Sequence, residues 1–293
     1  MKKYIHLVVL MLFVSSALIA QEDVEAPEKT VDKPVRAPWE SGVLINHHTS
    51  VIQSAKTLEM VINHRFGSVN NGISDIYGIM APGANIRIGF NYSILDNVMV
   101  GFGTNSQKQY QDLQVKYTPF QQTRANTIPV SLTVYGNMAI NGQDEDVFGM
   151  DYTFADRLTY FGEVIVGRKV TDALSVMASA NFTHFNSVDS IMDHDKIGVG
   201  VGARFRVSPQ SSITVEWGLP LEISALSEQT EFIDHPRHHL SIGWEVSTST
   251  HAFQIFVTNS LGILPQEMYM NNQNEFNKDG IRFGFNITRL WNF

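Results

Sequence analysis

Residues 280–293 read GIRFGFNITRLWNF, and the large apolar side chains of this stretch fall mostly on alternate positions. Ile281, Phe283 and Phe285 lie on one parity, while Arg282 and Asn286 lie on the other. Successive side chains of a strand point to opposite faces, so this spacing predicts a β-strand with one apolar and one polar face. The printed sequence stops inside that pattern. We expect this last strand to pair with the first strand of a closed barrel, because a barrel leaves no free sheet edge.

The same period of two recurs along most of the chain. In TLEMVINHRF (57–66), Leu58, Met60 and Ile62 occupy one parity and Glu59, Asn63 and Arg65 the other, and in KIGVGVGARFRV (196–207) apolar residues alternate with charges and glycines. Strands of soluble β-sandwiches also alternate in this way. Alternation therefore predicts an all-β protein but does not by itself separate a sandwich from a membrane barrel.

The connections between the alternating segments separate these two classes. Very short joints, at 95–97, 170–173, 207–210 and 247–250, alternate with longer polar segments near 67–83, 141–156, 222–236 and 261–279. Membrane barrels combine tight periplasmic turns with longer external loops. Many of the predicted strands are also ten or more residues long, beyond the usual five or six. We predict a closed antiparallel up-and-down transmembrane β-barrel of about twelve strands over residues 56–293, with strands near 57–66, 84–93, 97–105, 110–118, 128–140, 157–170, 173–187, 193–207, 211–221, 237–247, 250–260 and 280–293.

The N-terminal region differs in composition from this repeating pattern. Lys2 and Lys3 precede an apolar run and then small residues, which predicts a secretory signal peptide over residues 1–20. Residues 21–40 mix charges with prolines and should form a flexible tail. GVLINHHTSVIQ (42–53) is strand-like, but counting it would give the barrel an odd number of strands. We therefore predict that residues 21–55 form an N-terminal periplasmic extension or a plug segment outside the barrel wall.

Charge and cysteine content exclude several kinds of partner and site. The chain has 21 Lys and Arg against 29 Asp and Glu, a net charge of −8, which argues against nucleic acid as a partner. It has no cysteine, so it can form neither a disulfide nor a thiolate metal site. We predict no cofactor.

If the apolar face meets lipid, the opposite face lines a lumen. The side chains predicted there carry both signs of charge, and basic residues are somewhat more numerous than acidic ones. They are Glu59, Arg65, Arg87, Lys116, Glu163, Lys196, Arg204, Arg206, Glu216, Glu245 and Arg282, with Asp112 and Lys169 on the same parity. One interpretation is a narrow channel whose basic residues favour anions. The other is a closed lumen in which opposite charges pair. About twelve strands lie between small filled barrels and the 16 to 18 strands of open porins.

Residues that could carry chemistry are scattered and lack a supporting pattern. Ser249 and His251 are close in sequence but have no GxSxG context. Of the histidines at 47, 48, 194, 235, 238 and 239, His235 lies three and four positions before His238 and His239, but HPRHH falls at a predicted junction of loop and strand and not on a helix, and we interpret it as polar surface. The acidic stretch 143–151 lacks the spaced ligands of a calcium loop. We predict that the chain is not an enzyme and holds no metal.

The chain resembles bacterial outer-membrane β-barrel proteins, and IRFGFNITRLWNF resembles their C-terminal signal. The resemblance implies a place in the outer membrane of a Gram-negative bacterium, surrounded by lipid. It also implies recognition by the barrel-assembly machinery through the last strand, at Phe283, Phe285, Ile287, Trp291 and Phe293. More narrowly, LEMVINHRFG (58–67), GIMAPGANIRIGFNYSILDN (78–97) and HAFQIFVTNS (251–260) resemble a barrel-forming family known only as a domain of unknown function. That family implies no activity and no site residue.

Two functions remain open from the sequence. The first is a narrow pore or transporter for small polar or anionic solutes. The second is a closed barrel that acts as a structural or accessory subunit of an envelope complex, with another envelope protein as its partner.

Overall fold

The computed structural model describes residues 32–228 and 235–293. The predicted signal peptide (1–20) and the first part of the predicted extension (21–31) lie outside the described residues. The chain divides into two compact units, Met1–Asp32 and Lys33–Phe293, and the fold reported below is that of the second unit.

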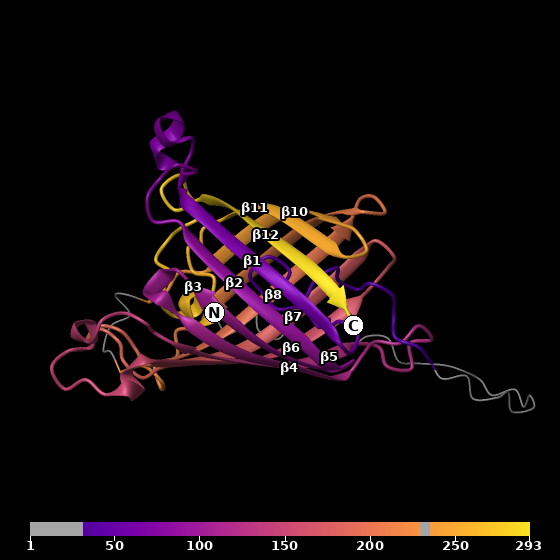
Figure 1. The fold of residues 1–293 in the computed structure, drawn as a ribbon, viewed down its shortest axis with the longest axis horizontal. Helices are drawn as coiled ribbons and strands as arrows, with labels where there is room; N and C mark the ends of the chain where they lie inside the picture. The colour runs from indigo at the N-terminus through magenta and orange to yellow at the C-terminus, as the bar shows by residue number, and fades with distance from the viewer. Residues whose placement is uncertain (1–31, 229–234) are drawn as a thin grey trace, which may run out of the picture. The chain divides into compact units, whose positions relative to one another are not determined.

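Twelve antiparallel strands of the described part form a closed up-and-down barrel (Figure 1). Each strand pairs with its neighbours in sequence, and β12 pairs with β1. The predicted fold class is confirmed, and each predicted strand lies within three residues of an observed one. The strands are β1 (Thr57–Ser68), β2 (Asn85–Leu95), β3 (Val98–Asn105), β4 (Gln111–Phe120), β5 (Ser131–Ile140), β6 (Leu158–Lys169), β7 (Leu174–Phe185), β8 (Asp195–Arg206), β9 (Ser211–Pro220), β10 (His239–Ser247), β11 (His251–Thr258) and β12 (Arg282–Asn292).

The seam of the barrel joins the two ends of the strand order. Thr57 lies opposite Asn292 and Arg65 lies opposite Gly284, so nine consecutive positions of β1 are in register with β12. In Figure 1 the yellow arrow of β12 runs beside the indigo ribbon of β1. The strand that closes the barrel is therefore residues 57–68, and the strand-like segment 42–53 is not part of the wall.

Connections at the two ends of the barrel differ in length. Residues 96–97, 170–173, 207–210 and 248–250 make tight turns at one end, where only the connection 121–130 is longer. Single-chain bacterial barrels place their short turns in the periplasm, so we call this the periplasmic end. The other end carries longer connections, which contain the short helices η1 (Val69–Asp75), η2 (Gln107–Gln109), η3 (Glu145–Phe148), η4 (Phe154–Arg157) and α2 (Pro265–Asn271). Among the described residues, no helix has the length and apolar character needed to cross a membrane.

Burial in the barrel is the reverse of burial in a soluble protein. Outward-facing apolar side chains are exposed, for example Ile255 at 66% and Leu113 at 52%, whereas inward-facing charged residues are buried, with Arg65 at 0% and Glu216 at 1%. In water such an arrangement would forfeit the hydrophobic contribution to stability and bury charge as well. It is stable when the outer face meets lipid and the inner polar groups bond to one another.

Candidate functional site in the lumen

Residues 41–50 fold into a small hairpin, which we call the lumen hairpin. Val43 and His48 form an antiparallel bridge, Leu44 N–H donates to the His47 carbonyl (2.8 Å), and Thr49 N–H donates to the Gly42 carbonyl (2.9 Å). Nearly all of its residues are buried. Because the side chains that bury them point inward from the wall strands, the hairpin lies inside the barrel.

Glu216 of β9 holds the tip of the lumen hairpin. Its carboxylate accepts hydrogen bonds from the backbone N–H groups of Ile45 (3.2 Å), Asn46 (2.9 Å) and His47 (3.1 Å), and from the Asn46 side-chain amide (2.5 Å). Successive backbone N–H groups that converge on one anion form a nest. Hydrogen bonds to a charged acceptor are the stronger kind, so Glu216 is the main polar anchor of the hairpin.

Four further wall residues bond to the hairpin from other sides of the barrel. Asn286 of β12 donates to the Ile45 carbonyl (2.8 Å), and Gln254 of β11 donates to the Leu44 carbonyl (2.5 Å). The Arg65 guanidinium of β1 donates to Asn46 Oδ1 (2.6 Å), and Lys116 Nζ of β4 donates to the Gly42 carbonyl (2.8 Å). These donors add partners to buried acceptors of the hairpin; the Gly42 carbonyl, for example, accepts from both Thr49 N–H and Lys116 Nζ.

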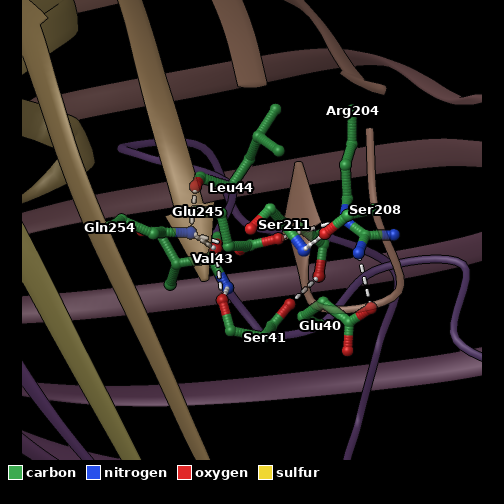
Figure 2. A network of polar contacts seen from close by, with 10 residues as sticks. Glu40, Ser41, Val43, Leu44, Arg204, Ser208, Ser211, Glu245 and Gln254 are labelled. Atoms are coloured by element: carbon green, nitrogen blue, oxygen red, sulfur yellow. Dashed lines mark hydrogen bonds and ion pairs between the residues drawn. The ribbon is translucent and has the colours of Figure 1, made fainter. Parts of the chain in front are cut away.

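The base of the hairpin joins an ion-pair network (Figure 2). Arg204 of β8 lies between two carboxylates, Glu245 of β10 (Nε to Oε1, 3.0 Å) and Glu40 just before the hairpin (Nη2 to Oε1, 2.5 Å). Gln254 connects Glu245 to the hairpin, because its amide donates both to Glu245 Oε2 (2.8 Å) and to the Leu44 carbonyl. Glu40 and Gln254 thus couple the segment 40–44 to three wall strands.

The opposite side of the hairpin is apolar. Trp39 and Leu44 belong to one buried cluster with inward-facing side chains of β5, β6 and β7 and with α2: Tyr135, Phe161, Ile165, Met177 and Tyr269. His48 stacks on Tyr135 with ring centroids 3.7 Å apart. The hairpin therefore contributes both polar and hydrophobic contacts to the filling of the lumen.

A row of inward-facing glycines on β8 makes room for these contacts. A Cβ atom added at Gly198 would lie 2.4 Å from Tyr269, one at Gly200 would lie 2.5 Å from His47, and one at Gly202 would lie 2.6 Å from Leu44. Such distances are well below van der Waals contact, which begins near 3.5 Å between carbon atoms. The glycines form the hollow in the wall that receives the hairpin and α2.

His47 links three elements at the centre of the lumen. Its Nε2 lies 2.6 Å from His239 Nε2 of β10 and 3.4 Å from the Tyr269 hydroxyl of α2. One imidazole must donate and the other accept, so the contact requires at least one neutral ring. Burial lowers the pKa of His47 from its ordinary value of 6.5, and this effect outweighs the opposite influence of Glu216.

α2 fills the lumen from the external end. Glu267 is buried and accepts hydrogen bonds from the Tyr110 hydroxyl (2.6 Å) and from Lys108 Nζ (3.0 Å), while Gln266 donates to Asn137 Oδ1 (2.7 Å). Between α2 and the hairpin, the described residues leave a void of about 20 Å³, lined in part by Ile45 and Leu264. That volume holds about one water molecule. The lumen in this conformation has no room for a solute at that point.

The comparison with protein families agrees with this architecture. Residues 39–291 match the model of a family described as membrane bound beta barrel domain (DUF5777). The chain belongs to this family. It is a β-barrel of the outer membrane of a Gram-negative bacterium, embedded in lipid. None of the curated proteins matches the chain in sequence.

Solved barrels resemble this member of the family only distantly. The KdgM porin is 8% identical and the match covers 80% of this chain and 98% of that chain, with a TM-score of 0.47. The NanC porin is also 8% identical, with 80% and 99% covered and a TM-score of 0.48. The outer membrane protein Omp33 of Acinetobacter baumannii is 11% identical, with 80% and 98% covered and a TM-score of 0.42. Likeness at this level carries no argument about function.

Most of the predicted lumen residues lie buried on the inward face of the wall. Arg87 pairs with Asp112 (2.7 Å) and Lys196 pairs with Asp193 of the β7–β8 connection (2.8 Å). Arg206 differs, because it is partly exposed at the periplasmic end of β8. The buried set is Glu59, Arg65, Arg87, Lys116, Glu163, Lys196, Arg204, Glu216, Glu245 and Arg282.

Sequence reasoning missed the partners of these wall residues. Strand parity identifies Glu216 and Arg204 as inward-facing, but it contains no signal that their partners lie in residues 40–47, about 170 positions earlier. It also missed α2, which the sequence analysis placed in a long loop. The buried Pro265–Met270 run, with proline at the first helical position, is the signal that could have indicated that helix.

The predicted assembly residues lie on or just beyond the outer face of β12. Phe283 and Phe285 are on this face, where Phe285 stacks on His64 of β1 with centroids 4.9 Å apart. Phe293 is 79% exposed at the periplasmic end. Their recognition by the assembly machinery stays a prediction.

Among residues 32–228 and 235–293, no three His, Asp or Glu side chains lie close enough together to hold a metal ion.

Proposed function

We propose that the protein is a gated outer-membrane pore for small polar or anionic solutes, closed in this conformation by the lumen hairpin and α2. The observation that carries the proposal is the nest around Glu216, which holds a segment that is not part of the wall inside the lumen. When the hairpin leaves, water can replace its hydrogen bonds at a net difference of about 0.5 to 1.5 kcal/mol each. The wall on that side then remains hydrated and charged.

The charge of the wall supports a mild preference for anions. Counting Asp112, the buried inward-facing set has six cationic side chains and five carboxylates; these are Arg65, Arg87, Lys116, Lys196, Arg204 and Arg282 against Glu59, Asp112, Glu163, Glu216 and Glu245. Charged residues along a narrow path tune ion selectivity. The near balance predicts weak selectivity rather than the exclusion of cations.

A closed accessory barrel is the second candidate, and the apolar cluster favours it. Departure of the hairpin would expose Leu44, Trp39 and their partners on β5 to β7 to water. Burial of a leucine side chain alone contributes about 1.5 to 3 kcal/mol. In that case the barrel would serve an envelope protein partner. We assign no catalysis to the protein under either function.

We also propose that the barrel-assembly machinery recognises β12 through its outward aromatic residues.

Single-channel conductance in planar bilayers distinguishes the two functions. The test variant replaces residues 41–50 by ten Gly and Ser residues, and the control replaces residues 144–153 of the external β5–β6 connection in the same way. If the protein is a pore, the parent and the control should show rare conductance steps and the hairpin variant frequent ones. In a KCl gradient, the reversal potential should indicate that chloride passes more easily than potassium. A second variant also replaces α2 (Pro265–Asn271) by Gly and Ser residues, because α2 fills the external end of the lumen. If both variants fold as heat-modifiable barrels and stay at leak current, the pore is wrong and the accessory role stands.

A further inference from the structure

A cavity of about 610 Å³ lies away from the lumen, at the periplasmic rim. We call it the rim groove. Three chain segments line it: residues 35–36 before the hairpin, 122–126 of the β4–β5 connection, and 168–172 at the end of β6 and in the following turn. Neither the hairpin nor α2 contributes to it.

The rim groove is basic in a chain that is acidic overall. Arg36, Arg124, Arg168 and Lys169 line it, against the single acid Asp172. Lys169 pairs with Asp172 (3.3 Å), whose side chain is 94% exposed. In the part of the chain that the structure describes, none of the three arginines has a carboxylate within 4.0 Å. Three arginines thus line one cavity without a carboxylate partner from residues 32–228 or 235–293; Arg124 Nε donates to the Pro34 carbonyl (3.0 Å).

The walls of the groove are held together by backbone bonds. Val35 N–H donates to the Gln122 carbonyl (2.9 Å), and Arg124 N–H donates to the Lys33 carbonyl (2.9 Å), so residues 33–35 lie antiparallel to 122–124 around a single β-bridge between Pro34 and Thr123. The buried Gln122 side chain bonds both to Lys169 N–H (2.7 Å) and to the Lys169 carbonyl (3.0 Å). These two hydrogen bonds fix the β4–β5 connection to the end of β6, so the groove is preformed.

The groove is continuous with the lipid-facing wall. Arg168 lies on the outward parity of β6, opposite Val176 of β7 and on the same face as Val164, which lies opposite Val134 of β5. The three valines are exposed on the outer face. Arg168 is therefore placed where the apolar band ends and the headgroups of the periplasmic leaflet begin, a position in which a long cation can reach phosphate.

We propose that the rim groove binds the phosphate headgroup of an anionic phospholipid of the periplasmic leaflet. Its acyl chains would lie on the valine-rich outer face of β5 to β7. Guanidinium groups suit this role, because their planar donors bond phosphate oxygens in pairs. The inference is independent of whether the lumen conducts.

Lipid retention by the full chain tests the proposal. Purified barrel in detergent is mixed with equal amounts of phosphatidylglycerol and phosphatidylcholine, and the bound lipid is read by native mass spectrometry. The test variant is Arg124→Gln with Arg168→Gln, and the exposed Arg36→Gln serves as a second, milder variant. The matched control is Arg237→Gln with Lys278→Gln, two cations of the external connections. All must run as heat-modifiable barrels.

The expected result is about a tenfold preference of the parent and the control for phosphatidylglycerol, reduced in Arg36→Gln and lost in the double variant. Equal retention of the two lipids by the parent, or an unchanged preference in the double variant, overturns the proposal. Two competitors test other sources of the anion. If glycerol phosphate, or the peptide QEDVEAPEKTV with the sequence of residues 21–31, displaces phosphatidylglycerol at equal concentration, the groove is not a lipid site.

Discussion

Glu216→Gln is the substitution that tests the anchoring of the lumen hairpin most directly. The glutamine keeps one oxygen, which can still accept from Asn46, but it presents an NH₂ group where the second carboxylate oxygen accepted from Ile45 and His47 N–H. Two buried N–H donors then face a donor. Leaving a buried donor without a partner costs about 1 to 3 kcal/mol, so the hairpin should be destabilised by about 2 to 6 kcal/mol.

That range corresponds to an increase of about 30-fold to about 20,000-fold in the population with the hairpin displaced, at about 1.4 kcal/mol per factor of ten. The chain has no cysteine, so Ser50→Cys provides a single thiol at a buried position of the hairpin. Labelling of this thiol by a polyethylene glycol maleimide, with the barrel intact, reports the displaced population. The same variants in planar bilayers report whether displacement opens a conducting path.

The matched control is Glu222→Gln, which makes the same chemical change in the exposed β9–β10 connection. It should leave the labelling rate at the parent value. The reasoning is refuted if Glu216→Gln labels no faster than Glu222→Gln while both remain folded. If Glu216→Gln labels faster without conductance, Glu216 is confirmed as the anchor, and the variant that also lacks α2 decides whether the lumen conducts.

Three further predictions concern the same hairpin. Gly200→Ala places a Cβ 2.5 Å from His47 and should raise thiol labelling at least tenfold, whereas Gly162→Ala, with no atom within 4 Å of its Cβ, should not. Burial lowers the pKa of His47 and lowers that of His48 further, with Lys116 adding to the effect on His48. The displaced hairpin therefore binds more protons, and the displaced population should rise as the pH falls below 6.5, the ordinary histidine value. Because the thiolate is the reacting species, the labelling rate is divided by that of the unfolded variant at the same pH, and a flat ratio between pH 7.5 and 5 would contradict this. Leu44→Ala should destabilise the closed lumen by about 2 to 5 kcal/mol, measured as faster labelling at unchanged barrel melting temperature.

Alternation and connection length carried the prediction of the wall because both are local properties. One side chain in two faces lipid along every strand, so a reader of GIRFGFNITRLWNF can assign Arg282 and Asn286 to the lumen without knowing their partners. Tight turns around residues 96–97 and 208–210 then impose antiparallel neighbours. Even the exclusion of residues 42–53 from the wall followed from the parity of strand number.

The contents of the lumen could not be predicted in the same way. In the sequence the glycines of β8 give no sign of a contact. In the structure Gly200 and Gly202 leave the space that the side chains of His47 and Leu44 occupy. The pair of Glu216 with the hairpin backbone has no side-chain signature, because the donors are main-chain N–H groups that every residue carries.

The amino-acid sequence by itself determined the all-β class, the number and limits of the strands, and which face of each strand is apolar and which is polar. These features depend on the two-residue period of a strand and on turn chemistry. Only the tertiary structure decided that the lumen is filled, because closing the barrel brings Glu40, Asn46 and Tyr269 against strands far away in the chain. Inward polarity alone is compatible with water or with protein inside. Which of the two is present depends on the complementarity of hydrogen bonds and volume, which exists only after the wall has closed.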